Sequence, residues 1–209
     1  MLEPIQGEGG VNVPADDYLR RVRAWCDQQG LLLILDEVQT GMGRLGSLFG
    51  YQEYGVEPDV MTLAKSLGCG VPIGAFLSKE SCMVLGPGDH GTTFGGNPLV
   101  TAAAYAGSKY LIDNGIPAHV KQMEKRLFAR LHELKTHFSF IIEVRGKGLL
   151  AAMEFDSDIA GTVLPHAHAA GVLLNAVKPN ALRFMSPLTI TAEEIDEGIG
   201  RLEKALKEI

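Results

Sequence analysis

The sequence predicts an α/β protein in which a mostly parallel sheet is followed by a smaller α+β region. Two observations indicate this fold class. Short apolar segments alternate with segments of helical period up to about residue 110. Beyond residue 137 the pattern changes to short strands that surround one helix. We therefore expect two domains, one over residues 1–115 and one, with its helical connector, over residues 116–209.

The strand expectations depend on apolar runs bounded by turn residues. Residues 31–35 (LLLIL) are apolar at every position, which is the pattern of a parallel strand covered on both faces. The predicted strands are 31–35, 59–64, 72–78, 140–144, 148–155, 172–175 and 181–184. The predicted helices are 14–29, 97–114, 117–137, 160–170 and a last helix from residue 191.

Local signals mark where these helices begin and end. The first helix places Tyr18, Val22, Trp25 and Cys26 on one face and is expected to stop at Gly30. Asn97 precedes a proline, the preferred order of an N-cap and the first helical position. The last helix opens on the T-x-x-E pattern of a capping box, from residue 191 to residue 194.

Composition excludes several classes of function. Of the 209 residues, 46% are apolar and 21% charged, which is ordinary for a globular protein. The net charge is −6 without a basic run, so nucleic acid and anionic membrane are not expected partners. No apolar run reaches the roughly 18 residues of a membrane span, and residues 1–10 lack the pattern of a signal peptide. We expect a cytoplasmic protein.

Neither the cysteines nor the histidines form a metal motif. The three cysteines lack metal-ligand spacing and are interpreted as cytosolic thiols. His166 and His168 are two residues apart on a predicted helix and therefore point to different faces. We expect no metal site.

Residues 41–46 (GMGRLG) match the glycine spacing of a dinucleotide site, but the context does not fit. Such a site needs a helix that opens on the glycines and an acidic residue about 20 positions later. The stretch that follows has no helical period, and the later position holds Lys65. We interpret the glycines as a flexible surface loop.

Asp36 and Lys65 follow two predicted parallel strands and are the first candidates for chemistry. Ligands of open α/β sheets bind in the crevice at the carboxyl ends of the strands. An amine that loses hydration there can attack a carbonyl, and a carboxylate can keep a pyridine nitrogen protonated. These are the two protein groups that pyridoxal 5′-phosphate requires. A lone snorkelling lysine at a strand end is the alternative.

The order of several motifs resembles one enzyme family. EPIQGEGG, DEVQTGMGR, LAKSLG, VPIGA, TTFGGNP and VRGKGLL occur in the order of the class III, fold-type I pyridoxal-phosphate aminotransferases, and the acetylornithine branch is the most similar. The resemblance covers essentially the whole chain. It implies part of the cofactor-binding large domain of that fold, followed by its small α+β domain. Family members are about twice as long, so it also implies a C-terminal half.

The resemblance assigns cofactor roles to four residues. Lys65 matches the lysine that forms the Schiff base, and Asp36 matches the carboxylate on the pyridine nitrogen. Gln39 matches an amide near the phenolic oxygen of the cofactor. Thr93 matches a hydroxyl that reaches the cofactor phosphate of a neighbouring subunit, which implies a homodimer. Thr93 also lies just before the predicted helix start at Asn97, where free backbone N–H groups and the positive end of the helix dipole favour phosphate.

Two further residues match substrate contacts. Arg183 matches the arginine that holds the substrate α-carboxylate, and its planar fork suits that group. Glu8 matches an acidic residue that pairs with this arginine in relatives acting on ω-amino groups.

The implied function is transfer of an amino group from N-acetylornithine to 2-oxoglutarate, as in arginine biosynthesis. Three alternatives stay open at this stage. The amino donor could be ornithine, 4-aminobutyrate or succinyldiaminopimelate. The scaffold could carry another pyridoxal-phosphate chemistry, such as that of a racemase or an aminomutase. The chain could also be a non-catalytic remnant that dimerises through the family interface.

Overall fold

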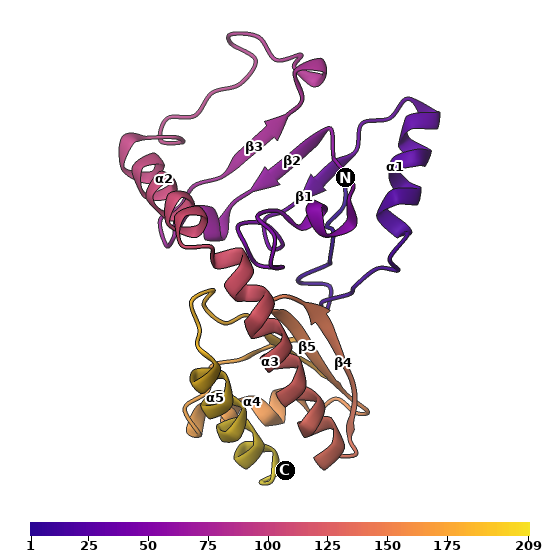
Figure 1. Cartoon of the computed structure of the whole chain (residues 1–209), viewed down its shortest axis with the longest axis vertical. Helices are drawn as coiled ribbons and strands as arrows, with labels where there is room; N and C mark the ends of the chain where they lie inside the picture. The colour runs from indigo at the N-terminus through magenta and orange to yellow at the C-terminus, as the bar shows by residue number, and fades with distance from the viewer. The chain divides into compact units, whose positions relative to one another are not determined.

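The computed structural model describes residues 1–209 and shows the predicted α/β fold (Figure 1). The chain divides into two compact units. Unit 1 comprises Met1–Pro4 and Pro14–Pro117, and unit 2 comprises Ile5–Val13 and Ala118–Ile209. Residues 5–13 therefore pack with unit 2, although the sequence analysis placed them in the first domain. No helix in the structure has both the length and the apolar character needed to cross a membrane.

Unit 1 is built on a three-stranded sheet in the order β1-β2-β3. The strands are β1 (Ile34–Asp36), β2 (Val60–Leu63) and β3 (Ala75–Ser78). β1 and β2 are parallel, whereas β3 runs antiparallel to β2. On its other side β1 forms a single parallel bridge, between Leu2 and Leu35.

The expectation that residues 31–35 form a strand covered on both faces is wrong for the first residues. Leu31 and Leu32 are exposed, whereas Leu33 and Leu35 are buried. The Leu31 N–H still donates to the carbonyl of Cys26 (2.9 Å), so this residue completes the end of the preceding helix. The strand can therefore begin only after the helix has closed its last hydrogen bonds.

α1 (Tyr18–Gln29) ends where expected, at Gly30, whose φ of 65° suits a glycine. Its predicted apolar face is mostly uncovered. Cys26 is buried, but Tyr18 and Trp25 are exposed. A periodic pattern thus predicted the helix correctly and did not decide which part of its surface is buried.

α2 (Pro98–Asp113) begins at the predicted cap. The Asn97 side-chain oxygen accepts hydrogen bonds from the backbone N–H groups of Leu99 (3.1 Å) and Val100 (3.2 Å). These bonds satisfy two of the N–H groups that the first helical turn leaves without partners. Unit 1 also contains three short 3₁₀ helices, η1 (Gly50–Tyr54), η2 (Lys65–Gly68) and η3 (Glu80–Cys82).

Unit 2 contains a four-stranded antiparallel sheet in the order β4-β5-β7-β6. Its strands are β4 (Ile141–Lys147), β5 (Leu150–Phe155), β6 (Asn175–Lys178) and β7 (Ala181–Phe184). Its helices are α3 (Ile116–His137), α4 (Ala160–Ala169) and α5 (Ala192–Leu206). The strand predicted at 172–175 begins at residue 175, because the Val172 N–H donates to the carbonyl of Ala167 (2.9 Å) and extends the end of α4.

The two faces of the unit 2 sheet have different surroundings. Phe184 lines an apolar cavity together with Leu127 of α3 and Ile199 of α5, so this side chain points toward the helices. Because side chains alternate along a strand, the neighbouring Arg183 points to the opposite face. The helices cover one face, and the polar groups described below lie on the other.

Candidate functional site

Asp36 and Lys65 lie at one edge of the unit 1 sheet. Asp36 is the last residue of β1 and pairs in register with Thr62 of β2. Lys65 follows two residues after β2 ends. Since β1 and β2 are parallel, their carboxyl ends meet at the same edge. The structure therefore gives this edge the carboxylate and the amine that the sequence analysis paired.

The backbone of Lys65 is unusual. Its φ is 46°, in the left-handed region that side chains with a Cβ seldom adopt. Such a conformation costs on the order of 1–2 kcal/mol, and residues of this kind cluster at functional sites. The next turn is stabilised by the Leu67 N–H, which donates to the carbonyl of Ala64 (3.0 Å). The strain thus falls on the residue that the sequence analysis selected for chemistry.

The polar groups near this edge fit a cofactor that has an aldehyde and a basic ring nitrogen. Asp36 is half-buried, and its Oδ1 accepts a hydrogen bond from the Val38 N–H (3.0 Å). Thr62, on the same face of the sheet, has a buried hydroxyl without a hydrogen-bond partner. A buried polar atom without a partner is costly and indicates a group that would satisfy it. Lys65 adds an exposed side chain.

Glu37, beside Asp36, has a structural role. It is buried and accepts hydrogen bonds from the Thr40 hydroxyl (2.5 Å) and from the N–H groups of Gly50 (2.8 Å) and Tyr51 (2.7 Å). Burial raises the pKa of Glu37, although these three hydrogen bonds oppose the shift. The carboxylate holds the turn after β1 against η1.

This role of Glu37 also explains an error in the sequence analysis. The glycine-rich segment 41–46 was expected at the surface, but Met42, Arg44 and Leu45 are buried. The Glu37 carboxylate binds residues on both sides of this segment, the Thr40 hydroxyl before it and the Gly50 N–H after it. Burial lowers the pKa of Arg44 to about 10. No residue of the segment itself signals this, because the carboxylate that organises it precedes it in the sequence.

Gln39 and Thr93 lie in different surroundings within unit 1. Gln39 is buried in the turn that follows Asp36. Thr93 is exposed in the stretch that precedes the cap of α2 at Asn97. The cofactor roles of both residues stay predictions.

Arg183 and Glu8 are brought together in unit 2 although 175 positions separate them. Arg183 Nη1 donates to Glu8 Oε1 at 2.7 Å. The Arg183 side chain is only 10% exposed, whereas that of Glu8 is 68% exposed. Arg183 Nε also donates to the side-chain oxygen of Asn175 (3.4 Å), a contact that the sequence analysis missed. The arrangement is a buried guanidinium whose carboxylate partner reaches it from the solvent side.

The sequence profile of the family described as Aminotransferase class-III matches residues 1–206 of the chain. The chain belongs to this family. The resemblance noted from the motifs is thereby confirmed, and with it the α/β fold of the class III aminotransferases.

Individual class III relatives add detail. The chain is 48% identical to the acetylornithine aminotransferase of Caldanaerobacter subterraneus subsp. tengcongensis, over 100% of this chain and 53% of that protein. The acetylornithine aminotransferase structure from Elizabethkingia anophelis is 35% identical, with a TM-score of 0.94 over 100% of this chain and 54% of that one. The chain spans about half the length of the relatives it matches.

A third relative concerns the cofactor. The ornithine aminotransferase of Toxoplasma gondii, crystallised with oxidized glutathione, is described as having partial occupancy of PLP at its active site. Its structure is 39% identical to this chain, with a TM-score of 0.91 over 99% of this chain and 50% of that one.

Proposed function

We propose that this chain is the C-terminal half of a pyridoxal-phosphate transaminase that moves an amino group from N-acetylornithine to 2-oxoglutarate. The observation that carries the proposal is that Asp36 and Lys65, whose backbone is strained, lie at the same edge of the sheet. Membership of the class III family supports it, as does the similarity to acetylornithine aminotransferases. The expected cytoplasmic location is part of the same proposal.

Pyridoxal phosphate, when bound, supplies an aldehyde that condenses with amines and a ring that takes up electrons from the substrate carbon. Asp36 would hold the proton on the ring nitrogen and so keep the ring positively charged. Lys65 would hold the cofactor and, once released, use its amine to move a proton from the substrate carbon. Gln39 would donate to the phenolic oxygen. Thr93 would reach the phosphate of a second copy in a homodimer.

The Glu8–Arg183 pair supports the choice of substrates. An ω-amino donor carries its reacting amine far from its α-carboxylate, so it does not need Arg183 beside the reacting carbon. 2-Oxoglutarate has a carboxylate directly next to its reacting carbon and would use the planar fork of Arg183. Glu8 would cover Arg183 in the first half of the reaction and leave it in the second. Ornithine, 4-aminobutyrate and succinyldiaminopimelate are alternative donors by the same argument.

A second candidate function is a non-catalytic subunit that binds another protein chain. The observation in its favour is the exposed apolar surface of unit 1, which includes Phe76 of β3 and Leu99 and Tyr105 of α2. Large exposed apolar surfaces mark association sites. This candidate differs from the first because it needs neither Lys65 nor Asp36.

Borohydride trapping tests the assignment of Lys65. The complete protein that contains this chain is incubated with pyridoxal phosphate, reduced with borohydride, digested and mapped by mass spectrometry. We expect a stable pyridoxyl label on Lys65 and none in Lys65→Arg. Lys79→Arg is the matched control, because Lys79 belongs to the same unit and pairs with Glu57 (3.3 Å). A label at another lysine, or the absence of any label, would reject the proposal.

The donor is tested separately. We expect kcat/KM to be highest for N-acetylornithine among N-acetylornithine, ornithine, 4-aminobutyrate and succinyldiaminopimelate, with 2-oxoglutarate as acceptor. A labelled Lys65 with a different preferred donor would keep the chemistry and change only the substrate. A labelled protein that transfers no amino group from any of the four would contradict the transaminase assignment.

A further inference from the structure

Two arginines lie in one row across the unit 2 sheet. The strand register pairs Arg145 of β4 with Ala152 of β5, and Ala152 with Arg183 of β7. Residues paired in this way point to the same face, so both guanidinium groups lie on the face away from α3 and α5. The backbones of Arg145 and Arg183 are two strand spacings apart, which is about 10 Å. Between them lies Ala152, which is small and fully buried.

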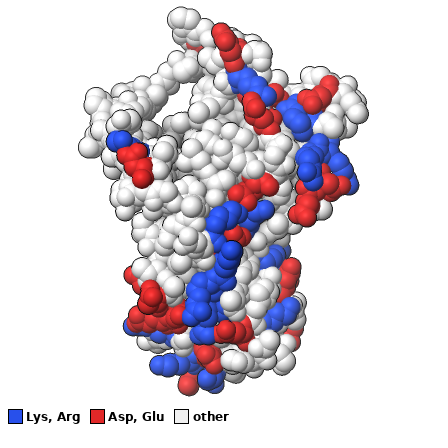
Figure 2. All heavy atoms as spheres, in the orientation of Figure 1, with Lys and Arg blue, Asp and Glu red and all other residues white.

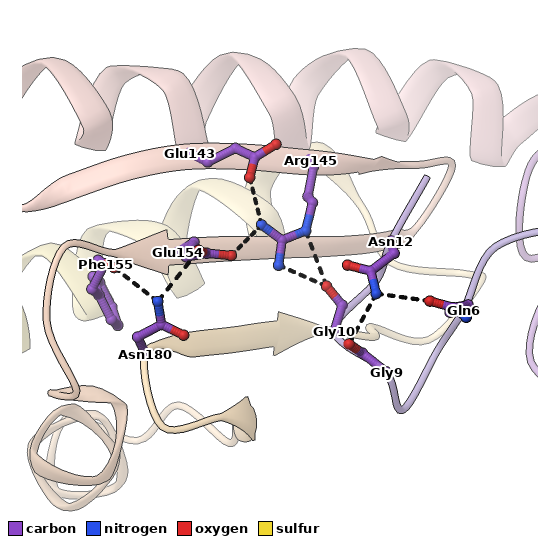
Figure 3. A network of polar contacts seen from close by, with 9 residues as sticks. All are labelled: Gln6, Gly9, Gly10, Asn12, Glu143, Arg145, Glu154, Phe155 and Asn180. Carbon is purple, nitrogen blue, oxygen red and sulfur yellow. Dashed lines mark hydrogen bonds and ion pairs between the residues drawn. The ribbon is translucent and has the colours of Figure 1, made fainter. Parts of the chain in front are cut away.

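The loop formed by residues 6–12 is attached to Arg145 through its backbone. Arg145 donates from Nε (3.0 Å) and from Nη2 (2.8 Å) to the carbonyl oxygen of Gly10. Figure 3 shows this guanidinium between the Gly10 carbonyl on one side and the carboxylates of Glu143 and Glu154 on the other. Glu8, two residues before Gly10, is bonded to Arg183. One loop is thus bound by both arginines of the row.

The loop is also braced internally. Gln6 and Asn12 exchange backbone hydrogen bonds of 3.2 and 3.1 Å. The Asn12 side-chain amide donates to the Gln6 side chain (2.8 Å) and to the carbonyl of Gly9 (3.0 Å), as Figure 3 shows. Gly10 has a φ of 116°, and any Cβ on it would lie 2.6 Å from the Cε atom of Lys178. The internal hydrogen bonds and the positive φ of Gly10 therefore give the loop a defined conformation.

The two attachments differ in how easily they open. The Arg145 side chain is only 11% exposed, and it binds a backbone carbonyl, which no side-chain rotation within the loop can move away. Its charge is balanced by Glu143 (2.7 Å) and Glu154 (2.6 Å), and Asn180 donates to Glu154 in turn (3.3 Å). The attachment to Arg183 is a carboxylate on a mostly exposed side chain. Glu8 can therefore swing away by rotation of its own side chain while the loop stays bound.

We propose that Arg145 is a positioning residue that holds Glu8 next to Arg183 and thereby sets how strongly carboxylate ligands must compete for Arg183. This inference rests on the proposed function of Arg183 as a carboxylate site. Glu8 acts as a tethered competitor, whose local concentration depends on how closely the loop is held. Arg145 supplies the tether without touching substrate.

The sign of the effect follows from the competition. A ligand that needs free Arg183 binds with an apparent Kd equal to its intrinsic Kd divided by the fraction of Arg183 not covered by Glu8. Loosening the loop lowers the local concentration of Glu8 and raises that fraction. Carboxylates should then bind more tightly, by about two- to fivefold for an ion pair with one exposed partner. A residue that only stabilised the fold would not improve binding.

Glutarate is a suitable probe, because it carries the two carboxylates of 2-oxoglutarate without the reacting carbonyl. Its Kd is measured by isothermal titration calorimetry on the complete protein. We expect Arg145→Gln and Glu8→Gln each to lower the Kd about two- to fivefold. In the Glu8→Gln background Arg145→Gln should have no further effect, because the competitor is already absent. Arg126→Gln is the control, since Arg126 pairs with Asp196 (2.7 Å) on the helices of the same unit.

Steady-state kinetics give a second readout. In Arg145→Gln the KM for 2-oxoglutarate should fall while the kcat and the KM for the amino donor change less. Asn12→Ala loosens the loop without altering Arg145, so it should lower the Kd of glutarate in the same direction. It serves in place of Arg145→Gln if that variant does not fold, as judged by circular dichroism.

The outcomes separate this inference from the function on which it rests. If Arg183→Gln leaves glutarate binding unchanged, the carboxylate site itself is wrong. If Arg183→Gln abolishes binding but folded Arg145→Gln and Asn12→Ala leave the Kd equal or higher, only the positioning role is rejected. The same holds if Arg145→Gln lowers the Kd equally in the presence and absence of Glu8.

Discussion

The two units bury their sheets to different extents. In unit 2 the central strands β5 and β7 are almost fully buried, and helices cover one face. In unit 1 every residue of β3 is at least partly exposed. On the face drawn in Figure 2, few charged side chains cover β3 and α2, whereas charges of both signs lie close together over the helices of unit 2. Exposed large apolar residues of unit 1 include Phe76, Leu77, Leu99, Tyr105 and Tyr110.

This difference indicates that unit 2 buries its apolar side chains within itself, whereas unit 1 leaves apolar side chains exposed and available for further contacts. An exposed strand with apolar side chains is normally paired or covered. The proposed chemistry lies in the less covered unit, and the proposed carboxylate site lies in the better covered one. The chain spans about half the length of the relatives it matches.

The largest effect expected from this comparison concerns two phenylalanines. Phe155 of unit 2 is fully buried against Phe140, with ring centroids 6.0 Å apart, so Phe155→Ala should lower the free energy of unfolding by about 3–5 kcal/mol. Phe76 of unit 1 is 52% exposed, so Phe76→Ala should change it by less than about 0.5 kcal/mol. Urea denaturation of the 209-residue chain measures both. Equal costs would show that the exposed face of unit 1 is covered after all, for instance by self-association.

A smaller effect is expected for Glu37, the one well-satisfied buried carboxylate of unit 1. Both of its oxygens accept backbone N–H groups, which the amide NH₂ of a glutamine cannot do. Glu37→Gln should therefore cost about 1–3 kcal/mol in unfolding free energy. Thr40→Val, which removes only the hydroxyl donor, should cost less.

The difference in unfolding free energy between the parent chain and Glu37→Gln should depend on pH, in a direction set by the pKa of Glu37. Since burial raises the pKa of Glu37 in the folded chain, the folded state binds its proton more strongly than the unfolded state does. The resulting stabilisation is present below the unfolded value of about 4.3 and is lost as pH rises through the folded pKa. The stability of the parent relative to Glu37→Gln should thus increase as pH falls from 7 toward 4. An opposite slope would mean that the three hydrogen bonds outweigh burial.

The smallest expected effect is the loss of unfolding free energy when one helix cap is removed in each unit. Asn97 caps α2 of unit 1, and Thr191 forms a reciprocal box with Glu194 at the start of α5 in unit 2. Asn97→Ala and Thr191→Ala should each cost about 1 kcal/mol. If the units unfold separately, Thr191→Ala lowers the same transition as Phe155→Ala, and Asn97→Ala lowers the other. A single transition lowered by both would show that the units unfold as one.

The sequence alone determined the features that depend on neighbouring residues. The helix starts at Asn97 and Thr191 and the helix end at Gly30 were predicted, because caps and left-handed glycines act over a few positions. Asp36 and Lys65 were selected because each directly follows a predicted apolar strand, 31–35 and 59–64. The strained backbone of Lys65 was not predicted, since it depends on the turn around it.

Only the tertiary structure decided the features that join distant residues. It placed residues 5–13 in unit 2, bound Gly10 to Arg145 and brought Glu8 to Arg183. The motif VRGKGLL contains Arg145, but nothing in the motif shows that its partner is a backbone carbonyl 135 positions earlier. The local sequence pattern indicates which residues are apolar and which are helical. Which polar group faces which is set by strand register and loop packing, and these depend on the whole chain.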